Sequence, residues 1–349
     1  MQVTELRGDR HTIGALHGSR HADEIHRGMA VYDHLFHDFV GLDWPTARRQ
    51  AQRFLPAIER HFPAILDEIV GLAHGAGVDF DDILTLNCRS EISLTQANGG
   101  CSAFSLARGN QWLAQNWDWR ADQQHNVVAL RIATNDAPAL ISLGEAGMLA
   151  KIGLNEVGVG VGLNAIRSRT CGTGLPIHVA LRKILESPDF AAAKRVATDD
   201  RVASPAHFLL AGSGGDAVGL EVQPDPPGEI SPHDGIVTHT NHLCASPGLA
   251  DFPRADSHSR LDRLQRCLDN ACLKDMRTEP DEINVETLFA ILSDHDNSPV
   301  SICRHHNPAQ PESERMETLF SVVMNLDRRE LHVRLGKPCR PLSALRVSL

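Results

Sequence analysis

The pattern of apolar and polar positions divides the chain near residue 100. Before that point apolar residues recur at spacings of three and four, most clearly over residues 51–72, which is typical of amphipathic helices. Gly75 and Gly77 end this segment. A further short helix is predicted over residues 81–89, with Asp79 as its cap. We therefore predict an all-helical front end.

Beyond Gly99 and Gly100 the pattern changes to short strands interrupted by pairs of helices. In residues 157–163 glycine alternates with apolar side chains, which leaves room on one face for a closely packed neighbour. Antiparallel strands mixed with helices favour two sheets packed face to face with helices outside, an α+β fold. Strands are predicted over residues 101–106, 112–117, 127–134, 139–143, 157–163, 207–211, 218–222, 236–240, 319–326 and 331–335, and helices over 175–186, 257–272 and 285–292.

Composition and charge limit the classes of partner that the protein can bind. With 349 residues, 42% of them hydrophobic, the chain can build a substantial core. Its formal net charge of −10 gives no basic face for a nucleic acid. The first residues lack a secretory signal, and no run of about 18 apolar residues could span a bilayer. We expect a soluble cytoplasmic protein without nucleic-acid or membrane partners.

Cysteine and histidine spacing predicts neither disulfides nor a metal site. The eight cysteines are scattered without close pairs, which suits reduced thiols better than a disulfide framework or a zinc ribbon. Two close histidine pairs could in principle bind a metal, His17 with His21 and His305 with His306. Neither is accompanied by an HExxH motif or a second Cys/His pair, so we expect no metal.

One short segment, from Asn98 through Gly99 and Gly100 to Cys101, combines a flexible peptide with a nucleophile. The glycines allow the peptide to bend, and the Cys101 thiolate could attack the Gly100 carbonyl and release its own amine. That amine would then be a suitable general base, because α-amino groups titrate near neutral pH. Taken alone, the spacing favours a simpler interpretation, a glycine turn followed by a buried cysteine.

Five ordered motifs change that balance, and together they resemble the acyl-CoA:6-aminopenicillanic acid acyltransferase family, also called isopenicillin N acyltransferases. The similarity runs from about residue 10 to the end of the chain. The motifs are Leu86-Asn87-Cys88-Arg89-Ser90-Glu91, Gly100-Cys101-Ser102-Ala103, Gln115-Asn116-Trp117-Asp118-Trp119, Thr240-Asn241-His242 and Ser301-Ile302-Cys303-Arg304.

The resemblance implies a four-layer αββα sandwich of the N-terminal-nucleophile (Ntn) hydrolase type with a helical N-terminal segment. It also implies a precursor that cuts itself between Gly100 and Cys101. The products would be an α-chain of residues 1–100 and a β-chain of residues 101–349, which remain together as a heterodimer. Cys101 would be both the cleavage site and the catalytic nucleophile.

The same resemblance assigns roles to three further residues. Asp118 is expected near the nucleophile's amine, Asn241 is expected to serve the oxyanion hole through its amide, and Arg304 is expected to hold Asp118 or a substrate carboxylate. Because Arg89 and Glu91 lie on the last helix before the cleavage site, we expect them to form an ion pair that shapes it, with Asn116 as a supporting residue. Simpler roles stay open: Asn116 and Asn241 as turn residues, Arg304 in a surface ion pair, and Trp117 and Trp119 as core aromatics.

The expected reaction is amide chemistry through an acyl-thioester on Cys101, on a small N-acylated amine or amino acid and without a cofactor. Water or an amine could resolve the thioester, so acyl-CoA-dependent N-acyl transfer, with acyl-CoA as co-substrate, remains an alternative. Two other classes also remain open. One is a cysteine hydrolase that is not cleaved and uses His239 or His242 as its base, and the other is a non-catalytic small-molecule binding protein on the same scaffold.

Overall fold

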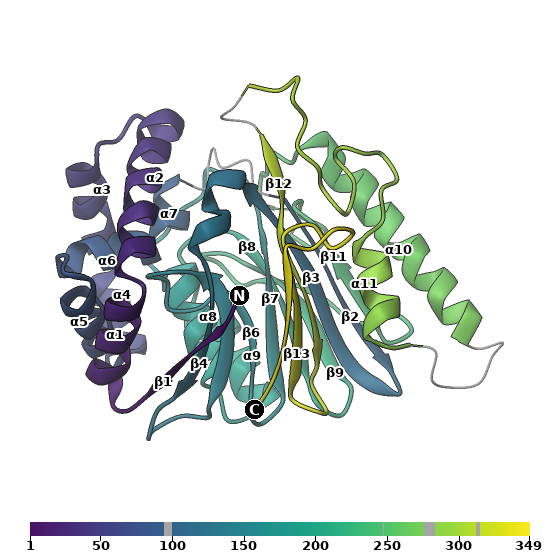
Figure 1. The fold of residues 1–349 in the computed structure, drawn as a ribbon, viewed down its shortest axis with the longest axis horizontal. Coiled ribbons are helices and arrows are strands. Elements are labelled where there is room, and N and C mark those ends of the chain that lie inside the picture. The colour runs from purple at the N-terminus through teal and green to yellow at the C-terminus, as the bar shows by residue number, and fades with distance from the viewer. Residues whose placement is uncertain (94–99, 247, 276–282, 312–314) are drawn as a thin grey trace.

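The computed structural model describes residues 1–93, 100–246, 248–275, 283–311 and 315–349, and these fold into four layers (Figure 1). Helices α10 and α11 cover the six-stranded sheet, the eight-stranded sheet packs behind it, and α8 and α9 cover the far side. The helices are α1 (Arg10–Arg20), α2 (Ala22–Val40), α3 (Trp44–Ala51), η1 (Gln52–Phe54), α4 (Leu55–His61), α5 (Ile65–Ala76), α6 (Phe80–Asn87), α7 (Arg89–Ser93), η2 (Ala121–Asn126), α8 (Ile177–Leu185), α9 (Phe190–Asp199), α10 (Ala255–Asp275) and α11 (Val285–Leu292).

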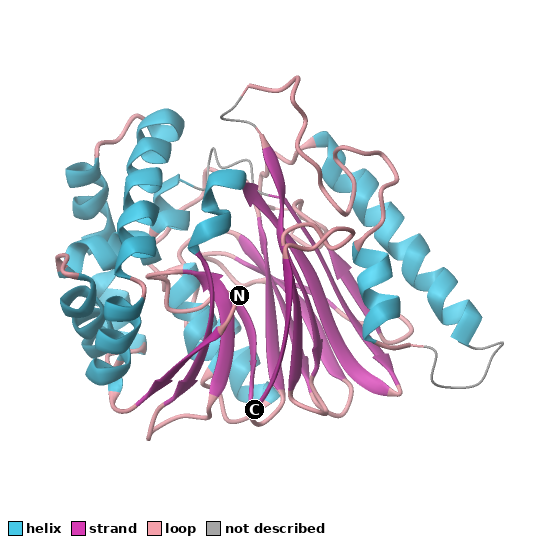
Figure 2. Cartoon of the chain, in the orientation of Figure 1, coloured by secondary structure: helices cyan, strands magenta, loops and turns pink. Residues whose placement is uncertain are grey.

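The two sheets are almost entirely antiparallel. The eight-stranded sheet has the order β1-β4-β5-β6-β7-β8-β9-β10, and the six-stranded sheet has the order β11-β2-β3-β12-β13-β14 (Figure 2). The strands are β1 (Val3–Arg7), β2 (Gly100–Arg108), β3 (Asn110–Arg120), β4 (Val127–Ala133), β5 (Leu140–Glu145), β6 (Ile152–Asn155), β7 (Val159–Ala165), β8 (Ala206–Gly212), β9 (Asp216–Val222), β10 (Gly228–Ile230), β11 (Ile236–His239), β12 (Met316–Asn325), β13 (Glu330–Leu335) and β14 (Ser343–Ser348).

The alternating glycines of β7 lie where the two sheets meet, as the sequence predicted. A Cβ atom on Gly160 would lie 2.7 Å from Cδ2 of Leu326, and one on Gly162 would lie 2.7 Å from Oε1 of Gln115. Gln115 is on β3 of the opposite sheet, and its side chain bonds the main chain of Leu163 in both directions. Larger residues at these glycines would therefore push the sheets apart.

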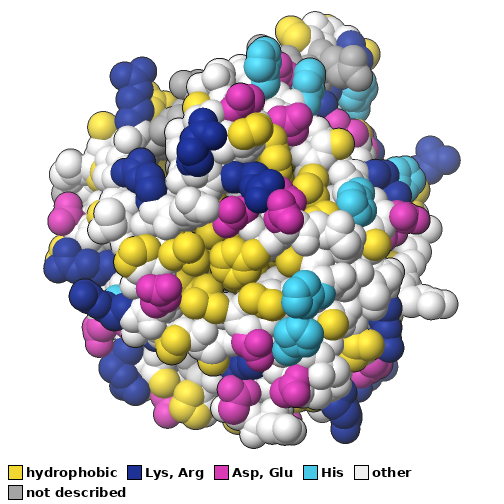
Figure 3. All heavy atoms as spheres, turned by 90° about the vertical axis from the view of Figure 1, so that its left-hand side faces the viewer, with side chains coloured by type: hydrophobic (Ala, Val, Ile, Leu, Met, Phe, Trp, Pro, Cys, Tyr) yellow, Lys and Arg dark blue, Asp and Glu magenta, His cyan; other side chains and the backbone are white. Residues whose placement is uncertain are grey.

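The N-terminal helices pack against one edge of the sandwich, at the left of Figure 1. Helices α1 and α5 cross closely because each presents glycines to the other: a Cβ on Gly14 would lie 2.0 Å from the Glu68 carbonyl oxygen, and one on Gly71 would lie 2.1 Å from that of His11. The surface on this side intermingles charged side chains of both signs around a band of hydrophobic ones (Figure 3).

The prediction that the N-terminal part of the chain is entirely helical is wrong, because residues 3–7 form the strand β1. β1 pairs in parallel with β4 and adds an edge strand to the eight-stranded sheet. The helix over residues 51–72 is also broken into shorter pieces, because Pro56 opens α4 and Pro63 follows its end. α6 begins one residue after Asp79, which forms a capping box with Asp82, as expected of a capped helix.

Elsewhere the predicted helices and strands are confirmed to within a few residues at their ends. The short elements β6, β10, β14 and α9 were not predicted. No helix among the described residues is long and apolar enough to cross a membrane.

Candidate active site

Cys101 lies at the start of β2, with its side chain between the two sheets. Cys101 and Ala103 belong to the main core, whereas Phe104 and Leu106 pack into the separate cluster beneath α10 and α11. The Cys101 side chain faces the same way as Trp117, its partner on β3. Only 3% of Cys101 is exposed in the continuous chain. Burial, together with the nearby Asp118 carboxylate, raises the pKa of the Cys101 thiol.

Two side chains, which also bond each other, hold the main chain of Cys101. Its N–H donates to Oδ1 of Asn241 at 2.9 Å, and its carbonyl oxygen accepts from Nη1 of Arg260 at 2.6 Å. Arg260 also donates through Nη2 to the same Asn241 oxygen at 2.9 Å. The nitrogen that would become the new chain terminus is therefore fixed in position.

Asn241 is itself held by three elements. It follows the end of β11, its main-chain N–H donates to Oγ of Ser257 on α10 at 2.9 Å, and its Nδ2 donates to the carbonyl of Ala165 at the end of β7 at 3.0 Å. In the uncleaved chain its oxygen, not its N–H, faces Cys101. The oxyanion role expected for the amide stays a prediction. A turn residue would not need these contacts.

Asp118 and Arg304 pack against Gly100, the residue that precedes Cys101. Asp118 lies opposite Gly100 in the β2–β3 register, and a Cβ atom on Gly100 would lie 2.7 Å from Asp118 Oδ2 and 3.2 Å from Arg304 Nε. Arg304 Nε donates to Asp118 Oδ2 at 3.2 Å, and Thr318 donates to Oδ1 at 2.7 Å. Arg304 is only 2% exposed, so the surface ion pair considered for it is wrong. Asn98 and Gly99 of the predicted cleavage segment lie outside the described residues.

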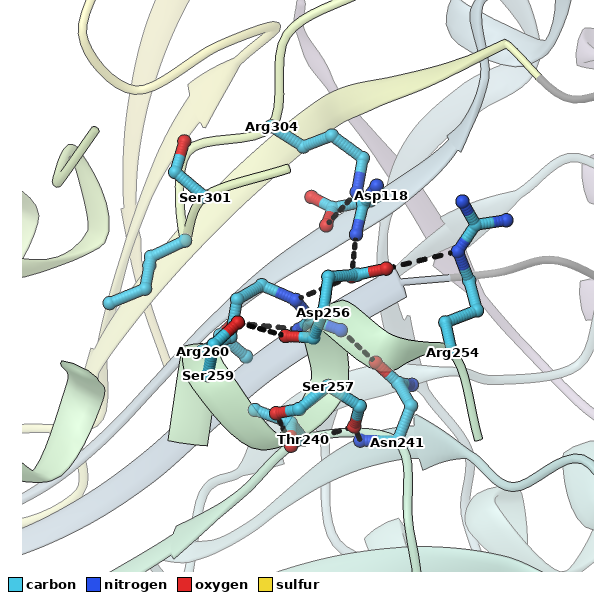
Figure 4. Close-up of polar contacts among 12 residues, drawn as sticks. Asp118, Thr240, Asn241, Arg254, Asp256, Ser257, Ser259, Arg260, Ser301 and Arg304 are labelled. Carbon is cyan, nitrogen blue, oxygen red and sulfur yellow. Dashed lines mark hydrogen bonds and ion pairs between the residues drawn. The ribbon is translucent and has the colours of Figure 1, made fainter. Parts of the chain in front are cut away.

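A buried network of charges links these groups to α10 (Figure 4). Asp256 accepts from Nε of Arg260 at 3.1 Å, from Nε of Arg254 at 3.1 Å, and from Nη2 of Arg304. Burial alone would raise the pKa of Asp256, but Arg304, Arg260 and Arg254 outweigh it and lower the pKa to about 2. Neither Arg260 nor Asp256 was predicted to belong to the site, although opposite charges four residues apart on a helix are a recognisable ion-pair spacing.

A second charged cluster lies between the sheets, on the side that Cys101 and Trp117 face. Lys151 Nζ lies 3.0 Å from Glu145 Oε2 and 3.4 Å from the centroid of the Trp117 ring. Burial lowers the pKa of Lys151 to about 7, although Glu145 opposes the shift. Arg89 donates to Glu145 at 2.7 Å and Tyr32 donates to it at 2.5 Å. Lys151 was not predicted to belong to the site. A single cation among apolar residues is the sequence feature that marks it.

The expected Arg89–Glu91 ion pair is therefore wrong, because the Arg89 guanidinium binds Glu145. Glu91 instead accepts from the main-chain N–H of Ile177 at 2.9 Å and from Ser204 at 3.0 Å, which ties α7 to the start of α8. Burial raises the pKa of Glu91 to about 7.

The remaining predicted residues also have defined partners. Asn116 lies inside β3 and donates to the carbonyls of Leu292 and Ile302 at 2.8 and 2.9 Å, so the turn role considered for it is wrong. It instead helps fix the segment that leads to Arg304. Trp117 and Trp119 are buried and stacked at 6.5 Å between ring centroids.

The two histidines considered as alternative bases have other partners. His239 bonds Glu221 at 3.2 Å and the Thr240 carbonyl at 2.9 Å, and His242 bonds Ser257 at 2.8 Å. Among the hydrogen bonds of the described residues, none joins either ring to Cys101.

With this geometry established, comparison with known proteins identifies the family. The sequence model of the family described as acyl-coenzyme A:6-aminopenicillanic acid acyl-transferase matches residues 106–340. The chain belongs to this family. It is also 31% identical over 339 residues to the 40 kDa form of acyl-coenzyme A:6-aminopenicillanic-acid acyltransferase from Emericella nidulans, an alignment that covers 94% of this chain and 91% of that relative.

Solved structures agree with this acyltransferase family assignment at the level of fold. Two crystal structures of conjugated bile acid hydrolase from Clostridium perfringens superpose with TM-scores of 0.54 and 0.53. Each covers 71% of this chain and 92% of its own, at 11% and 10% identity. The predicted αββα sandwich of the Ntn-hydrolase type is therefore confirmed.

Proposed function

We propose that this chain is a self-cleaving Ntn amidohydrolase or acyltransferase whose nucleophile is Cys101. The proposal rests on the four buried polar side chains that surround Gly100 and Cys101. Asp118 and Arg304 leave no room for a side chain before the Gly100–Cys101 bond, while Asn241 and Arg260 hold the main chain after it. A turn followed by an ordinary core cysteine would need none of these four buried polar groups.

Self-cleavage would follow from this arrangement. The Cys101 sulfur attacks the Gly100 carbonyl carbon, the C–N bond breaks, and the thiol proton passes to the departing nitrogen. Water then hydrolyses the Gly100 thioester, which leaves a carboxylate on Gly100 and a free thiol on Cys101. The nitrogen stays beside Asn241 Oδ1, which accepts from it at 2.9 Å in the uncleaved chain.

The freed amine then serves the second reaction. As a general base it takes the Cys101 thiol proton while the sulfur attacks the amide carbon of a substrate, and it returns the proton to the departing amine. The acyl group remains on the sulfur until water or an acceptor amine removes it. Lys151, on the side that Cys101 faces, favours the thiolate, because its positive charge lowers the thiol pKa against the effect of burial.

Hydrolysis or acyl exchange on a small N-acylated amine or amino acid fits the surroundings. Arg167, two residues beyond the Ala165 carbonyl that holds Asn241, has a buried Nε without a hydrogen-bond partner among the described residues. Burial and the nearby Arg254 lower the pKa of Arg167, because both disfavour its positive charge. An anionic group on the substrate would stabilise that charge.

Acyl-CoA-dependent transfer is the second candidate. It is supported by family membership and by the Emericella nidulans relative, whose name specifies an acyl-coenzyme A donor and 6-aminopenicillanic acid. Both candidates pass through the same acyl-thioester on Cys101. They differ in the acyl donor, which is an amide in the first and acyl-CoA in the second, and in the group that finally accepts the acyl chain.

The test is to trap that thioester. Purified protein is mixed with a panel of N-acyl amines and N-acyl amino acids, with and without acyl-CoA, quenched in acid, and examined by intact mass spectrometry alongside amine release. We expect the acyl mass on the fragment that begins at Cys101. Cys171→Ser, which removes an exposed thiol elsewhere, should label equally. Acylation of an uncleaved chain would favour the histidine-based alternative, and binding without any acylation would favour the non-catalytic one.

A further inference from the structure

The segment around Arg304 brings together two cysteines and two histidines. His295, Cys303, His305 and Cys339 each offer one ligand atom, and all four atoms lie within 4.8 Å of one another. His295 and His305 come from the loop after α11, and Cys339 comes from the connection between β13 and β14. From these positions we propose a structural zinc site of the Cys2His2 type, which the sequence analysis did not expect.

Four of the six distances within the cluster lie close to the edges of a zinc tetrahedron, and the other two are no longer than 4.8 Å. With Zn–S near 2.3 Å and Zn–N near 2.05 Å, ideal edges are about 3.8 Å for S–S, about 3.6 Å for S–N and about 3.3 Å for N–N. The observed separations are 3.6 Å between the Cys303 and Cys339 sulfurs and 3.6 and 3.5 Å from these to His305 Nε2. The two histidine Nε2 atoms lie 3.0 Å apart. One ion can therefore contact all four atoms after small shifts.

The chemistry of the donors favours zinc over a harder cation. Thiolate and imidazole are the ligands that zinc takes in structural sites, where four protein groups close the coordination sphere. Two thiolates balance the charge of the ion, so the bound site is neutral. Binding releases the two thiol protons to water and involves no change of oxidation state.

The ion would fix Arg304 from both sides, because Cys303 and His305 are its immediate neighbours in the chain. Their main chains already bond Asp294 and Pro299, at 3.0 Å each. Zinc would add a link to the C-terminal connection through Cys339. Metal binding itself does not depend on the proposed function, whereas the consequence for Arg304 rests on it.

The test is metal analysis of the full chain, purified without a polyhistidine tag and under reducing conditions. We expect about one zinc per chain in the wild type and its loss in Cys339→Ser and His295→Ala, with Cys171→Ser as a thiol control that retains it. Cobalt(II) added to the metal-stripped wild type should give the visible absorption bands of a tetrahedral thiolate site, a readout that is independent of the variants' folding.

Three results would overturn the site. The first is wild-type protein that lacks zinc and takes up neither zinc nor cobalt. The second is equal zinc in the wild type and in folded Cys339→Ser. The third is a Cys303–Cys339 disulfide that persists when the protein is made and kept under reducing conditions. It would be seen as a mass about 2 Da lower than that of the chain with both thiols free. If zinc is confirmed, slower self-cleavage in Cys339→Ser with unchanged secondary structure would show that it positions Arg304.

Discussion

Gly100 is constrained by its neighbours and not by its backbone angles. Because Gly100 has no side chain, the Asp118 carboxylate and the Arg304 guanidinium can approach the residue that precedes Cys101. Glycine is therefore needed at position 100 because it leaves room for these two side chains. The backbone flexibility that the Gly-Gly pattern suggested is not needed to explain why glycine stands there.

Gly100→Ala should slow self-cleavage by about 10- to 100-fold, because Asp118 and Arg304 must move by up to an ångström to admit the new methyl group. The rate is followed by gel electrophoresis of freshly made precursor. Gly28→Ala on α2 is the matched control, since its new Cβ would lie 4.0 Å from the nearest neighbour. Cleavage of Gly100→Ala at the wild-type rate would show that these contacts are irrelevant.

Lys151 couples the stability of the fold to pH. Its pKa is about 7 in the folded chain and near the ordinary value of 10.5 when unfolded. Between these pH values the unfolded chain binds a proton at Lys151 that the folded chain does not. This group therefore makes the free energy of unfolding rise with pH from about 7 to 10.5. Below pH 7 Lys151 is protonated in both states, so it adds no pH dependence there.

Lys151→Met should flatten that rise, because no titrating group remains at the position, and should slow acylation as the thiolate loses a neighbouring cation. Urea unfolding at a series of pH values measures the first effect. Lys194→Met, which removes a partly exposed lysine paired with Glu229, is the control. An unchanged slope in Lys151→Met would contradict the assignment.

At the scale of elements, α7 is joined to α8 by the buried carboxyl of Glu91. Its pKa is about 7 in the folded chain and near 4.5 when unfolded. The folded chain therefore holds the extra proton between pH 4.5 and 7, so this group makes the free energy of unfolding fall with rising pH across that window and leaves it level above.

Glu91→Gln should remove that fall while keeping an oxygen to accept from Ile177 and Ser204. The measurement is again urea unfolding, here between pH 4 and 7.5, with exposed Glu59→Gln as the control. A Glu91→Gln profile that still declines like the wild type would place the titration elsewhere.

Elements with a strong period could be predicted from sequence, and elements defined by tertiary contacts could not. β7 was recognised from its alternating glycines, and α6 from its capping residue. β1 is five residues long and becomes a strand only through its pairing with β4, a partner more than a hundred residues away. The helix break at Pro56 shows local chemistry overriding a continuous period.

At the scale of the whole molecule, the site could be predicted only as far as motifs and local spacing allowed. The resemblance supplied Cys101, Asp118, Asn241 and Arg304, which the structure brings together. Arg260, Asp256 and Lys151 reach the site from a helix and a loop without a motif, and Cys339 reaches His305 across 34 residues. Arg89 pairs with Glu145 and not with Glu91. Glu145 ends β5, a strand that was predicted, but the spacing of residues could not show that this strand ends beside α7.

Intact mass spectrometry of freshly purified wild type beside Cys101→Ala shows whether Cys101 becomes the N-terminal residue of a separate chain. We predict two fragments that meet between Gly100 and Cys101 in the wild type, and one full-length chain in the variant. An active wild-type preparation in which the bond between residues 100 and 101 is intact would contradict the proposal.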